Sequence, residues 1–314
     1  EVILILGSLV GLLLLRVPVA FAMGFLGVAL LWLKGFPLIA VPQRLFGSMD
    51  SFELLAVPLF LLMSNVLLKG GVGRDLFASV QAWVGHWPGG LGVATIKSCT
   101  LFSAISGSSV ATAATIGTVA IPEMERRGYD KPFILGQLAA GGTLGILIPP
   151  SILAIIYAVV AEQSVGELFI GAVIPGLMLS GMYIVYITLR CLIQPDLGPA
   201  IPVEERISLR EKLGLVREMT APLVLIVLVL GVIFTGVATP VEAAGIGTFG
   251  SFIVAALHRR LSWVTIQESC ITTLKASAMV LWIMFGATVF VGLYVIQGGQ
   301  TFVQEALAAT GLGK

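Results

Sequence analysis

Residues 89–124, GGLGVATIKSCTLFSAISGSSVATAATIGTVAIPEM, are apolar enough to enter a lipid bilayer, yet their centre is crowded with Ser, Gly and Thr. The flanking segments HWPGG and PEMERRGYDKP belong on one side of a membrane if the neighbouring spans alternate in direction. An even number of crossings is then required, and a helical hairpin that turns inside the membrane supplies it. A helix from Leu91 to Ser106 would rise about 24 Å. Its tip would therefore lie past the midplane of a hydrocarbon layer about 30 Å thick.

The predicted hairpin tip is Ser106-Gly107-Ser108-Ser109. Non-helical backbone survives at that depth only where it is buried in protein or lines a polar cavity. The tip would expose carbonyl groups at the end of the first arm and amide groups at the start of the second. Carbonyl and hydroxyl oxygens suit a dehydrated sodium ion, and amides at a helix N-terminus suit a carboxylate. The alternative is that these small residues only pack against other helices.

A second interruption is predicted within residues 133–161, which would be about 43 Å long as one straight helix. The Pro149-Pro150 pair lacks two amide hydrogens and obstructs the preceding turn, which leaves the carbonyls of Gly145 and Ile146 without partners. A simple proline kink is the alternative. Small or polar residues beside this break are Gly141, Gly142 and Ser151.

The composition predicts an all-α polytopic membrane protein. Hydrophobic residues make up 57% of the chain and charged residues 11%, whereas soluble domains carry about 25% charged residues. Amphipathic connectors at 36–50, 74–87 and 262–275 suit helices that lie in the membrane interface. The predicted spans are 1–15 (short), 17–33, 52–68, 133–161, 167–191, 220–238, 240–257 and 276–296.

Basic residues predict the orientation. Threading the spans alternately places most Lys and Arg on one side, whereas the other side receives Lys34, Arg44 and few others. The basic side is therefore expected to be cytoplasmic. The polar linker 194–218 then lies in the cytoplasm and divides the chain into two halves.

The two halves show a weak internal repeat. Pro240 lies 222 residues after Pro18, and the pair Gly298-Gly299 lies 228 residues after Gly70-Gly71. The threading inverts one half relative to the other, which is a recurrent plan of secondary transporters. This period predicts a second half that continues beyond Lys314, so the fold is expected to be C-terminally incomplete; the absence of a leading Met predicts that part of a larger protein precedes residue 1. The expected divisions are first-repeat scaffold helices (1–88), transport elements (89–161), a connecting helix with the linker (162–219), and second-repeat scaffold helices (220–314).

Other polar residues favour structural roles. Thr239-Pro240-Val241-Glu242 is typical of a capping box with Pro at the first helical position. The predicted mid-membrane segments contain no paired carboxylates, no cluster of His and Cys and no nucleophile-base set, and the sequence contains no phosphate-binding loop. We therefore expect no enzyme, no cofactor, no direct ATP coupling and no nucleic-acid partner.

Three strings carry a resemblance to a known family: SAISGSSVATAATIG (103–117), GGTLGILIPPS (141–151) and TPVEAAGIG (239–247). They resemble the large membrane subunit of tripartite ATP-independent periplasmic (TRAP) transporters of the C4-dicarboxylate and sialic acid type. The resemblance implies an elevator-type transporter with re-entrant hairpins and discontinuous helices in a bacterial inner membrane. It also implies sodium-driven import of a small carboxylate, together with a small Q-type membrane subunit and a periplasmic P-type binding protein. A non-transporting scaffold that anchors partners is the alternative function.

The resemblance also implies roles for individual residues in the hairpin and the break, and for two residues of the MFGATVF segment. The substrate contacts would be Ser106, Gly107, Ser108, Ser109 and Ser151. The sodium contacts would be Ser103, Ser106, Gly142, Thr143, Gly145, Ile146, Ile148, Pro149, Gly286 and Thr288.

Overall fold

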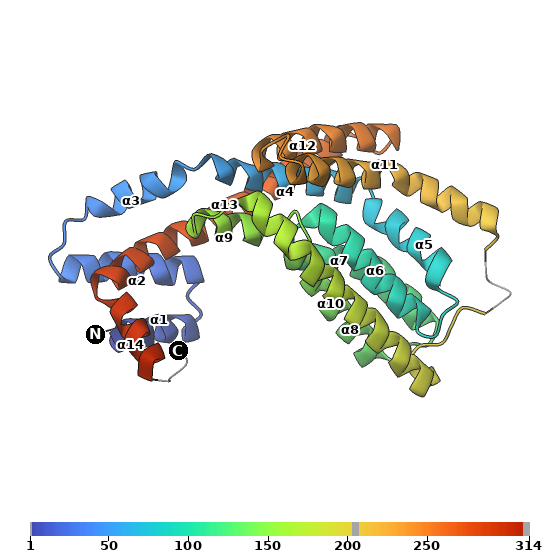
Figure 1. Ribbon diagram of the computed structural model, residues 1–314, viewed down its shortest axis with the longest axis horizontal. Helices are drawn as coiled ribbons and strands as arrows, with labels where there is room; N and C mark the ends of the chain where they lie inside the picture. The colour runs from blue at the N-terminus through green and yellow to red at the C-terminus, as the bar shows by residue number, and fades with distance from the viewer. Residues whose placement is uncertain (1, 203–206, 310–314) are drawn as a thin grey trace. The chain divides into compact units, whose positions relative to one another are not determined.

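The computed structural model describes residues 2–202 and 207–309, and this part of the chain is helical and without strands (Figure 1). The sequence prediction of an all-α polytopic membrane protein is confirmed. The α-helices are α1 (Val2–Leu14), α2 (Val19–Leu33), α3 (Ala40–Met49), α4 (Ala56–Lys69), α5 (Val72–Val84), α6 (Gly90–Ser106), α7 (Ser109–Arg126), α8 (Lys131–Leu147), α9 (Ile152–Val160), α10 (Val165–Ile193), α11 (Leu209–Phe234), α12 (Pro240–Leu257), α13 (Trp263–Ile296) and α14 (Gly299–Ala309), with short 3-10 helices η1 (Phe52–Leu55) and η2 (Pro195–Leu197).

Within the described residues, four helical segments are long and apolar enough to cross a membrane, and two bent pairs could add two more. The four are Phe52–Lys69, Val165–Ile193, Pro240–Leu257 and Trp263–Ile296. The predicted spans at 1–15 and 17–33 form helices that are apolar but shorter. Most of the predicted spans thus correspond to helices of the right length.

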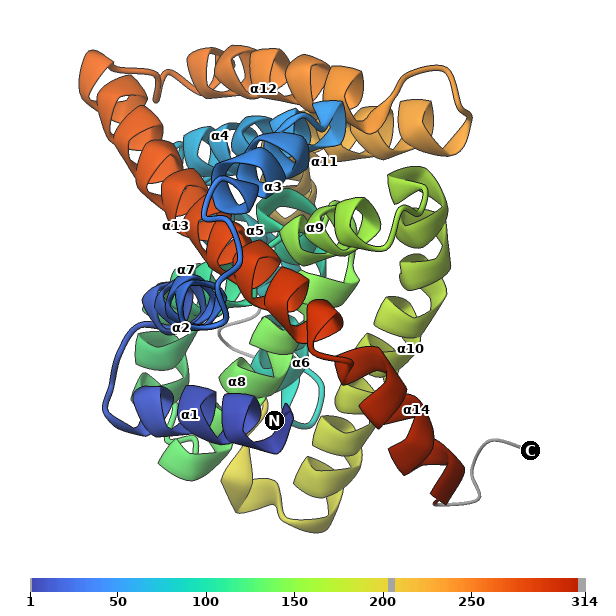
Figure 2. The ribbon, with the colours of Figure 1, turned by 90° about the vertical axis from the view of Figure 1, so that its left-hand side faces the viewer.

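Two helix boundaries differ from the prediction. The connector 262–275 was expected to be a separate interfacial helix, but it is continuous with the following span in α13 (Figure 2). The connector contains no Pro or Gly, so nothing in it interrupts the helix. Helix α11 begins within the predicted linker because Ser208 and Glu211 form a capping box at its start, which fixes an N-terminus there.

The chain divides into two compact units. The first unit comprises residues 1–51 and 275–314, and the second comprises residues 52–274. In the first unit, α2 and the later part of α13 approach closely, because a Cβ added to Gly27 would lie 2.8 Å from Val289 Cγ1. Close approach at small residues is the usual way in which membrane helices pack.

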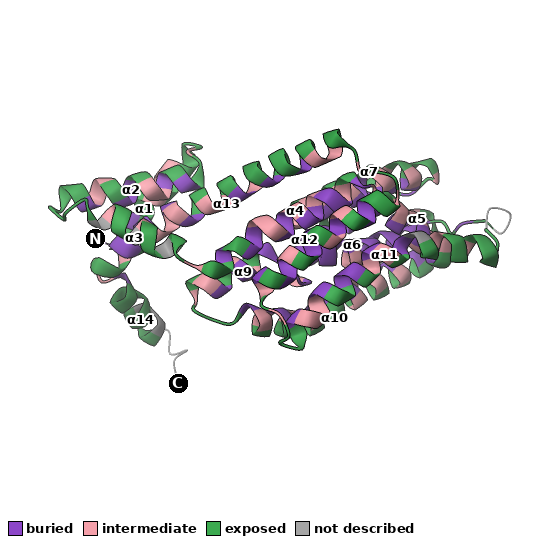
Figure 3. Ribbon diagram, turned by 90° about the horizontal axis from the view of Figure 1, so that it is seen from above, coloured by how far each residue is buried: buried purple, intermediate pink, exposed green. Residues whose placement is uncertain are grey.

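In the second unit, α6, α7 and α8 pack against one another, and α10 lies along α6 and α8 (Figure 1). Helix α4 packs against α12, and α5 packs against α6 and α11. Helix α6 is largely buried, whereas few residues of α10 are buried and about half are exposed (Figure 3). An apolar helix with so much exposed surface is suited to contact with lipid.

The repeated glycines adopt equivalent conformations in a register one residue away from the predicted one. Gly71 and Gly298 both have positive φ, +78° and +75°, and each directly precedes a helix. Glycine is the residue that adopts this conformation without steric cost. The equivalent glycines are therefore Gly71 and Gly298, not Gly70 and Gly298.

Candidate functional site

Helices α6 and α7 form a hairpin that turns where the sequence predicts. Gly107 caps α6 with φ +58°, and Ser108 is the N-cap of α7, where its Oγ accepts a hydrogen bond from Ala111 N at 3.4 Å. A left-handed Gly at the end of one helix and a Ser at the start of the next are the residues that such a turn requires. The hairpin is present in the structure, and its depth in a membrane stays a prediction.

Hydroxyl groups hold the turn together from within. Ser106 Oγ lies 2.7 Å from Thr112 Oγ1 and 3.3 Å from the carbonyl oxygen of Ser108. Ser108 N also donates to Ser106 Oγ, at 3.4 Å. The sequence did not predict Thr112 as a site residue, although it lies six residues after Ser106, across the hairpin tip, in the same string. The Ser106 side chain is thus engaged in bonds within the tip.

The long segment 133–161 is broken at the predicted position. Helices α8 and α9 meet at an angle of 42° across residues 148–151. Ser151 is the N-cap of α9, and its Oγ donates a hydrogen bond to the Ile146 carbonyl at 2.8 Å. The prediction that Ile146 would keep an unsatisfied carbonyl is therefore wrong, because the hydroxyl five residues later replaces the missing amide. Pro149 has no amide hydrogen to donate to the Gly145 carbonyl.

The hairpin tip packs directly on this break. A Cβ added to Gly107 would lie 2.5 Å from the Pro150 carbonyl oxygen, and Ile152 N donates to the Gly107 carbonyl at 3.3 Å. A Cβ added to Gly145 would lie 2.6 Å from the Ser108 carbonyl oxygen. We call the combination of residues 103–109 and 142–152 the junction. Backbone from two interrupted helices meets there, because glycine leaves no side chain between the two chains.

Four helix ends converge at the junction, and no side chain within it is charged. The C-terminal ends of α6 and α8 present carbonyl groups, which favour a cation, and the N-terminal ends of α7 and α9 present amides, which favour an anion. Ser103 is fully buried, and its Oγ has no hydrogen-bond partner among the residues that the structure describes. A buried hydroxyl normally has a partner, so Ser103 offers an oxygen atom for a ligand.

Comparison with known proteins shows the family of this chain. The model of the family described as "Tripartite ATP-independent periplasmic transporter, DctM component" matches residues 6–314. The chain belongs to this family. It is therefore a multi-pass membrane protein of the TRAP large permease type, and the resemblance seen in the three sequence strings is confirmed.

Curated relatives support the same assignment. The chain is 35% identical to the C4-dicarboxylate TRAP transporter large permease protein DctM of Rhodobacter capsulatus, over 99% of this chain and 73% of the relative. It is 39% identical to the protein of that name from Pseudomonas aeruginosa, over 79% of this chain and 57% of the relative. It is also 35% identical to the isethionate TRAP transporter permease protein DctMQ of Oleidesulfovibrio alaskensis, over 93% of this chain and 46% of the relative. The chain thus spans between about half and three quarters of the length of these TRAP permeases.

Three residues of this TRAP permease that the sequence predicts as sodium contacts instead contact other protein groups in the structure. Thr143 Oγ1 donates to the Ala140 carbonyl at 2.6 Å and lies 3.3 Å from the Tyr183 hydroxyl on α10. In the other compact unit, Gly286 packs against the backbone of Ala20, and Thr288 Oγ1 donates to its own helix at the Met284 carbonyl, 2.9 Å. The structure gives these residues packing and local hydrogen-bonding roles, and their contact with sodium stays a prediction.

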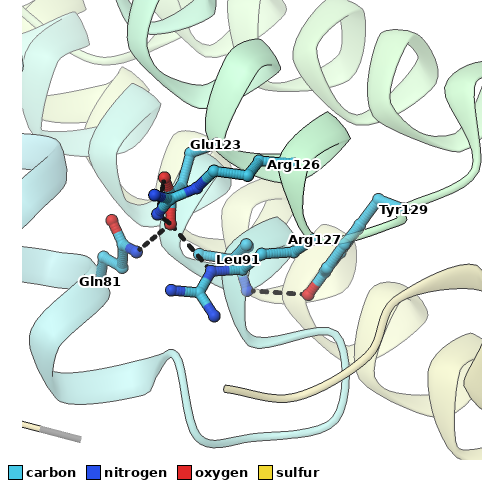
Figure 4. Close-up of polar contacts among 6 residues, drawn as sticks. All are labelled: Gln81, Leu91, Glu123, Arg126, Arg127 and Tyr129. Atoms are coloured by element: carbon cyan, nitrogen blue, oxygen red, sulfur yellow. Dashed lines mark hydrogen bonds and ion pairs between the residues drawn. The ribbon is translucent and has the colours of Figure 1, made fainter. Parts of the chain in front are cut away.

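The base of the hairpin, far from its tip, is closed by polar contacts that the sequence did not predict (Figure 4). Leu91 N, at the start of α6, donates to the Tyr129 hydroxyl just after α7, at 3.2 Å. Near the end of α7, Glu123 accepts hydrogen bonds from Arg126, Arg127 and Gln81 at 2.7–3.2 Å. Burial raises the pKa of the Tyr129 hydroxyl, so this group stays protonated and neutral. The Leu91–Tyr129 bond joins the start of α6 to the residue that follows α7, and the Gln81–Glu123 bond joins the end of α7 to α5.

Proposed function

We propose that this chain is part of the substrate-translocating subunit of a sodium-coupled importer of small carboxylates. The expected substrates include C4-dicarboxylates and sialic acid, and the expected location is the bacterial inner membrane. The names of relatives support a small-molecule substrate, since they specify C4-dicarboxylate, isethionate, ectoine and 2,3-diketo-L-gulonate for those proteins. A Q-type membrane subunit and a periplasmic P-type binding protein complete the proposed system.

The observation that carries the proposal is the convergence of two helix C-termini and two helix N-termini at the junction without a charged side chain. Helix termini of discontinuous helices bind ions and anionic substrate groups in several transporter families. We place the sodium ion at the carbonyl ends of α6 and α8, beside the buried hydroxyl of Ser103. We place the substrate carboxylate at the amide ends of α7 and α9, beside Ser108, Ser109 and Ser151.

This arrangement gives a physical reason for coupling. A cation at the carbonyl ends and an anion at the amide ends attract each other, and their interaction is strong where water is excluded. Occupation of either site therefore raises the affinity of the other, as linkage requires. We propose that residues 89–161, which hold both sites, move together as the transport elements.

The test is uptake of radiolabelled carboxylates by the full-length transporter in proteoliposomes, with the binding protein added outside. An inward sodium gradient is expected to drive accumulation, and an equal potassium gradient is not. Flux that is indifferent to sodium would remove the coupling assignment. Docking of the binding protein without any flux would favour the alternative of a non-transporting scaffold.

A further inference from the structure

A cavity of about 380 Å³ lies between α8, α10 and α6 in the second unit. None of its lining residues belongs to the junction. Its volume falls within the range of about 300–1,000 Å³ that is usual for small-molecule sites. The backbone hydrogen bond from Asp130 N to the Leu197 carbonyl, 3.3 Å, joins two of its walls. The residues that the following argument uses are Asp130, Phe133, Gln137, Tyr183, Tyr186 and Arg190.

A buried amide without partners lines this cavity. Gln137 is 4% exposed, and neither Oε1 nor Nε2 has a hydrogen-bond partner among the described residues. Its amide lies against Gly92, where a Cβ would collide with it. Because a buried amide needs both an acceptor and a donor, Gln137 calls for a ligand that supplies both.

Charges of both signs border the same cavity. Arg190, in the last turn of α10, is exposed and makes no ion pair that the structure records within residues 2–202 and 207–309. Asp130 caps α8, and its Oδ1 accepts from Phe133 N at 3.0 Å. Tyr183 and Tyr186 also line the cavity, and the Tyr183 hydroxyl lies 3.3 Å from Thr143 Oγ1. A guanidinium suits a phosphate and a carboxylate suits an ammonium group, so this set matches a zwitterion that carries both.

The surroundings of the cavity are suited to acyl chains. Phe133 and Ile187 form apolar parts of the lining, and α10 beside it exposes Met182, Tyr186 and Leu189, with exposed fractions of 64%, 61% and 54%. The cavity lies at the basic end of α10, which the distribution of Lys and Arg predicts to face the cytoplasm. Cavities between membrane helices at that level are known places for lipid head groups.

We propose that this cavity binds a phospholipid with a phosphoethanolamine head group, phosphatidylethanolamine. Arg190 and the tyrosine hydroxyls hold the phosphate, Asp130 holds the ammonium group, and the Gln137 amide contacts the polar head from below. The acyl chains lie along the exposed face of α10. The cavity shares no lining residue with the junction, and it meets the junction where the Tyr183 hydroxyl lies 3.3 Å from Thr143 Oγ1. The lipid assignment therefore does not depend on the sodium and carboxylate assignments.

The test uses the delipidated full-length transporter complex in detergent, with lipid binding measured by native mass spectrometry and by the shift in unfolding temperature. Phosphatidylethanolamine is expected to bind and stabilise, whereas phosphatidylglycerol, which lacks the ammonium group, is expected to bind at least about tenfold more weakly. Equal binding of the two lipids would overturn the proposal. Glycerophosphoethanolamine, the soluble head group without acyl chains, tests whether the ligand is a lipid or a free phosphoester. If it stabilises the protein as much as phosphatidylethanolamine does, the assignment to a lipid is overturned.

Variants test the residues. Arg190→Gln changes an exposed side chain and is expected to weaken phosphatidylethanolamine binding about tenfold, while Lys131→Gln, at the same end of α8 but outside the lining, leaves it unchanged. Gln137→Leu is expected to raise the unfolding temperature of the lipid-free protein and to reduce the stabilisation by lipid, because the buried amide is removed. Unchanged binding by Arg190→Gln would overturn the proposal, and so would unchanged lipid stabilisation by Gln137→Leu.

Discussion

The amide of Ile152 donates a hydrogen bond to the carbonyl of Gly107 at 3.3 Å, so the restart of the broken helix is fixed to the tip of the hairpin. These two residues belong to helices that are interrupted for different local reasons, a left-handed glycine in one and a proline pair in the other. Because of this hydrogen bond, the hairpin tip and the break between α8 and α9 are held against each other. A change on either side of the contact is therefore expected to affect both.

Gly107→Ala tests this contact. The added Cβ would lie 2.5 Å from the Pro150 carbonyl oxygen, at a residue whose φ is +58°. Alanine is strained in this conformation, so we expect the variant to assemble in the membrane but to lose sodium-dependent uptake by at least about tenfold. Gly171→Ala, on α10 with nothing within 4 Å of its added Cβ, is the matched control. Normal uptake by Gly107→Ala would show that the close contact is not needed.

Ser103→Ala tests the sodium assignment apart from folding. Ser103 Oγ has no partner within the described residues, so its removal is expected to leave the unfolding temperature unchanged while the sodium concentration for half-maximal uptake rises about tenfold. Ser98 provides a matched control, because it lies on the same helix and its Oγ is also buried without a partner among those residues. Ser98→Ala should leave the sodium dependence as it is. An equal effect of both substitutions would show that packing alone is at work.

A double-mutant cycle on Ser106 and Thr112 tests the internal bonds of the tip. Their hydroxyl oxygens are 2.7 Å apart and Thr112 is fully buried. Ser106→Ala and Thr112→Val should each lower stability by about 0.5–1.5 kcal/mol, measured as the shift in thermal unfolding in detergent. The double variant should cost less than the sum of the two, since the second substitution removes no further hydrogen bond. Additive effects would mean that the two hydroxyls do not interact.

The hairpin base is expected to respond to acid. Burial alone would raise the pKa of Glu123, but the hydrogen bonds and charges of Arg127 and Arg126 outweigh it and hold the pKa below the ordinary value of 4.5. A carboxyl with a lowered folded-state pKa contributes stability at neutral pH, and this stability is lost as the pH falls through the folded-state pKa. Because the cluster is partly exposed, we expect Glu123→Gln to lower stability at pH 7 by only about 0.5–1 kcal/mol.

Thermal unfolding of Glu123→Gln at several pH values is the measurement. The difference from the unsubstituted protein should shrink as the pH drops below 4.5. Glu125→Gln is the control, since Glu125 is more exposed and its distance to Lys131 is 3.5 Å. A Glu123→Gln effect that stayed constant from pH 7 down to pH 3 would rule out an electrostatic origin.

The sequence predicts those parts of the fold that local chemistry decides. Gly107 between two serines and the Pro149-Pro150 pair can each be interpreted from a few neighbouring residues, and both interruptions lie where the sequence predicts. The sequence does not predict the start of α11, because the charged residues around Ser208 and Glu211 favour a linker and hide their capping box. The sequence also predicts two helices where the structure has the single helix α13, since the polar residues in 262–275 favour an interfacial helix.

Contacts between distant residues could not be predicted in the same way. The Ser151 hydroxyl donates to the Ile146 carbonyl only because the chain bends at the proline pair. The residue types alone do not determine the angle of that bend. Arg260 Nη1 lies 2.5 Å from Asp75 Oδ2 and also donates to the Gly70 carbonyl at 2.8 Å. Arg260 follows these two residues by 185 and 190 positions in the sequence. Such pairs depend on how α4, α5 and α12 pack. The residue types along one sequence give no measure of that packing.

The most direct test of the central claim is an electron cryomicroscopy map of the full-length transporter in lipid nanodiscs, recorded in sodium and again in choline at the same ionic strength. We predict density for an ion between the Ser103 hydroxyl and the carbonyl end of α8 in the sodium map, and its loss in the choline map. Identical maps with an empty junction, or an ion bound only elsewhere, would contradict the account.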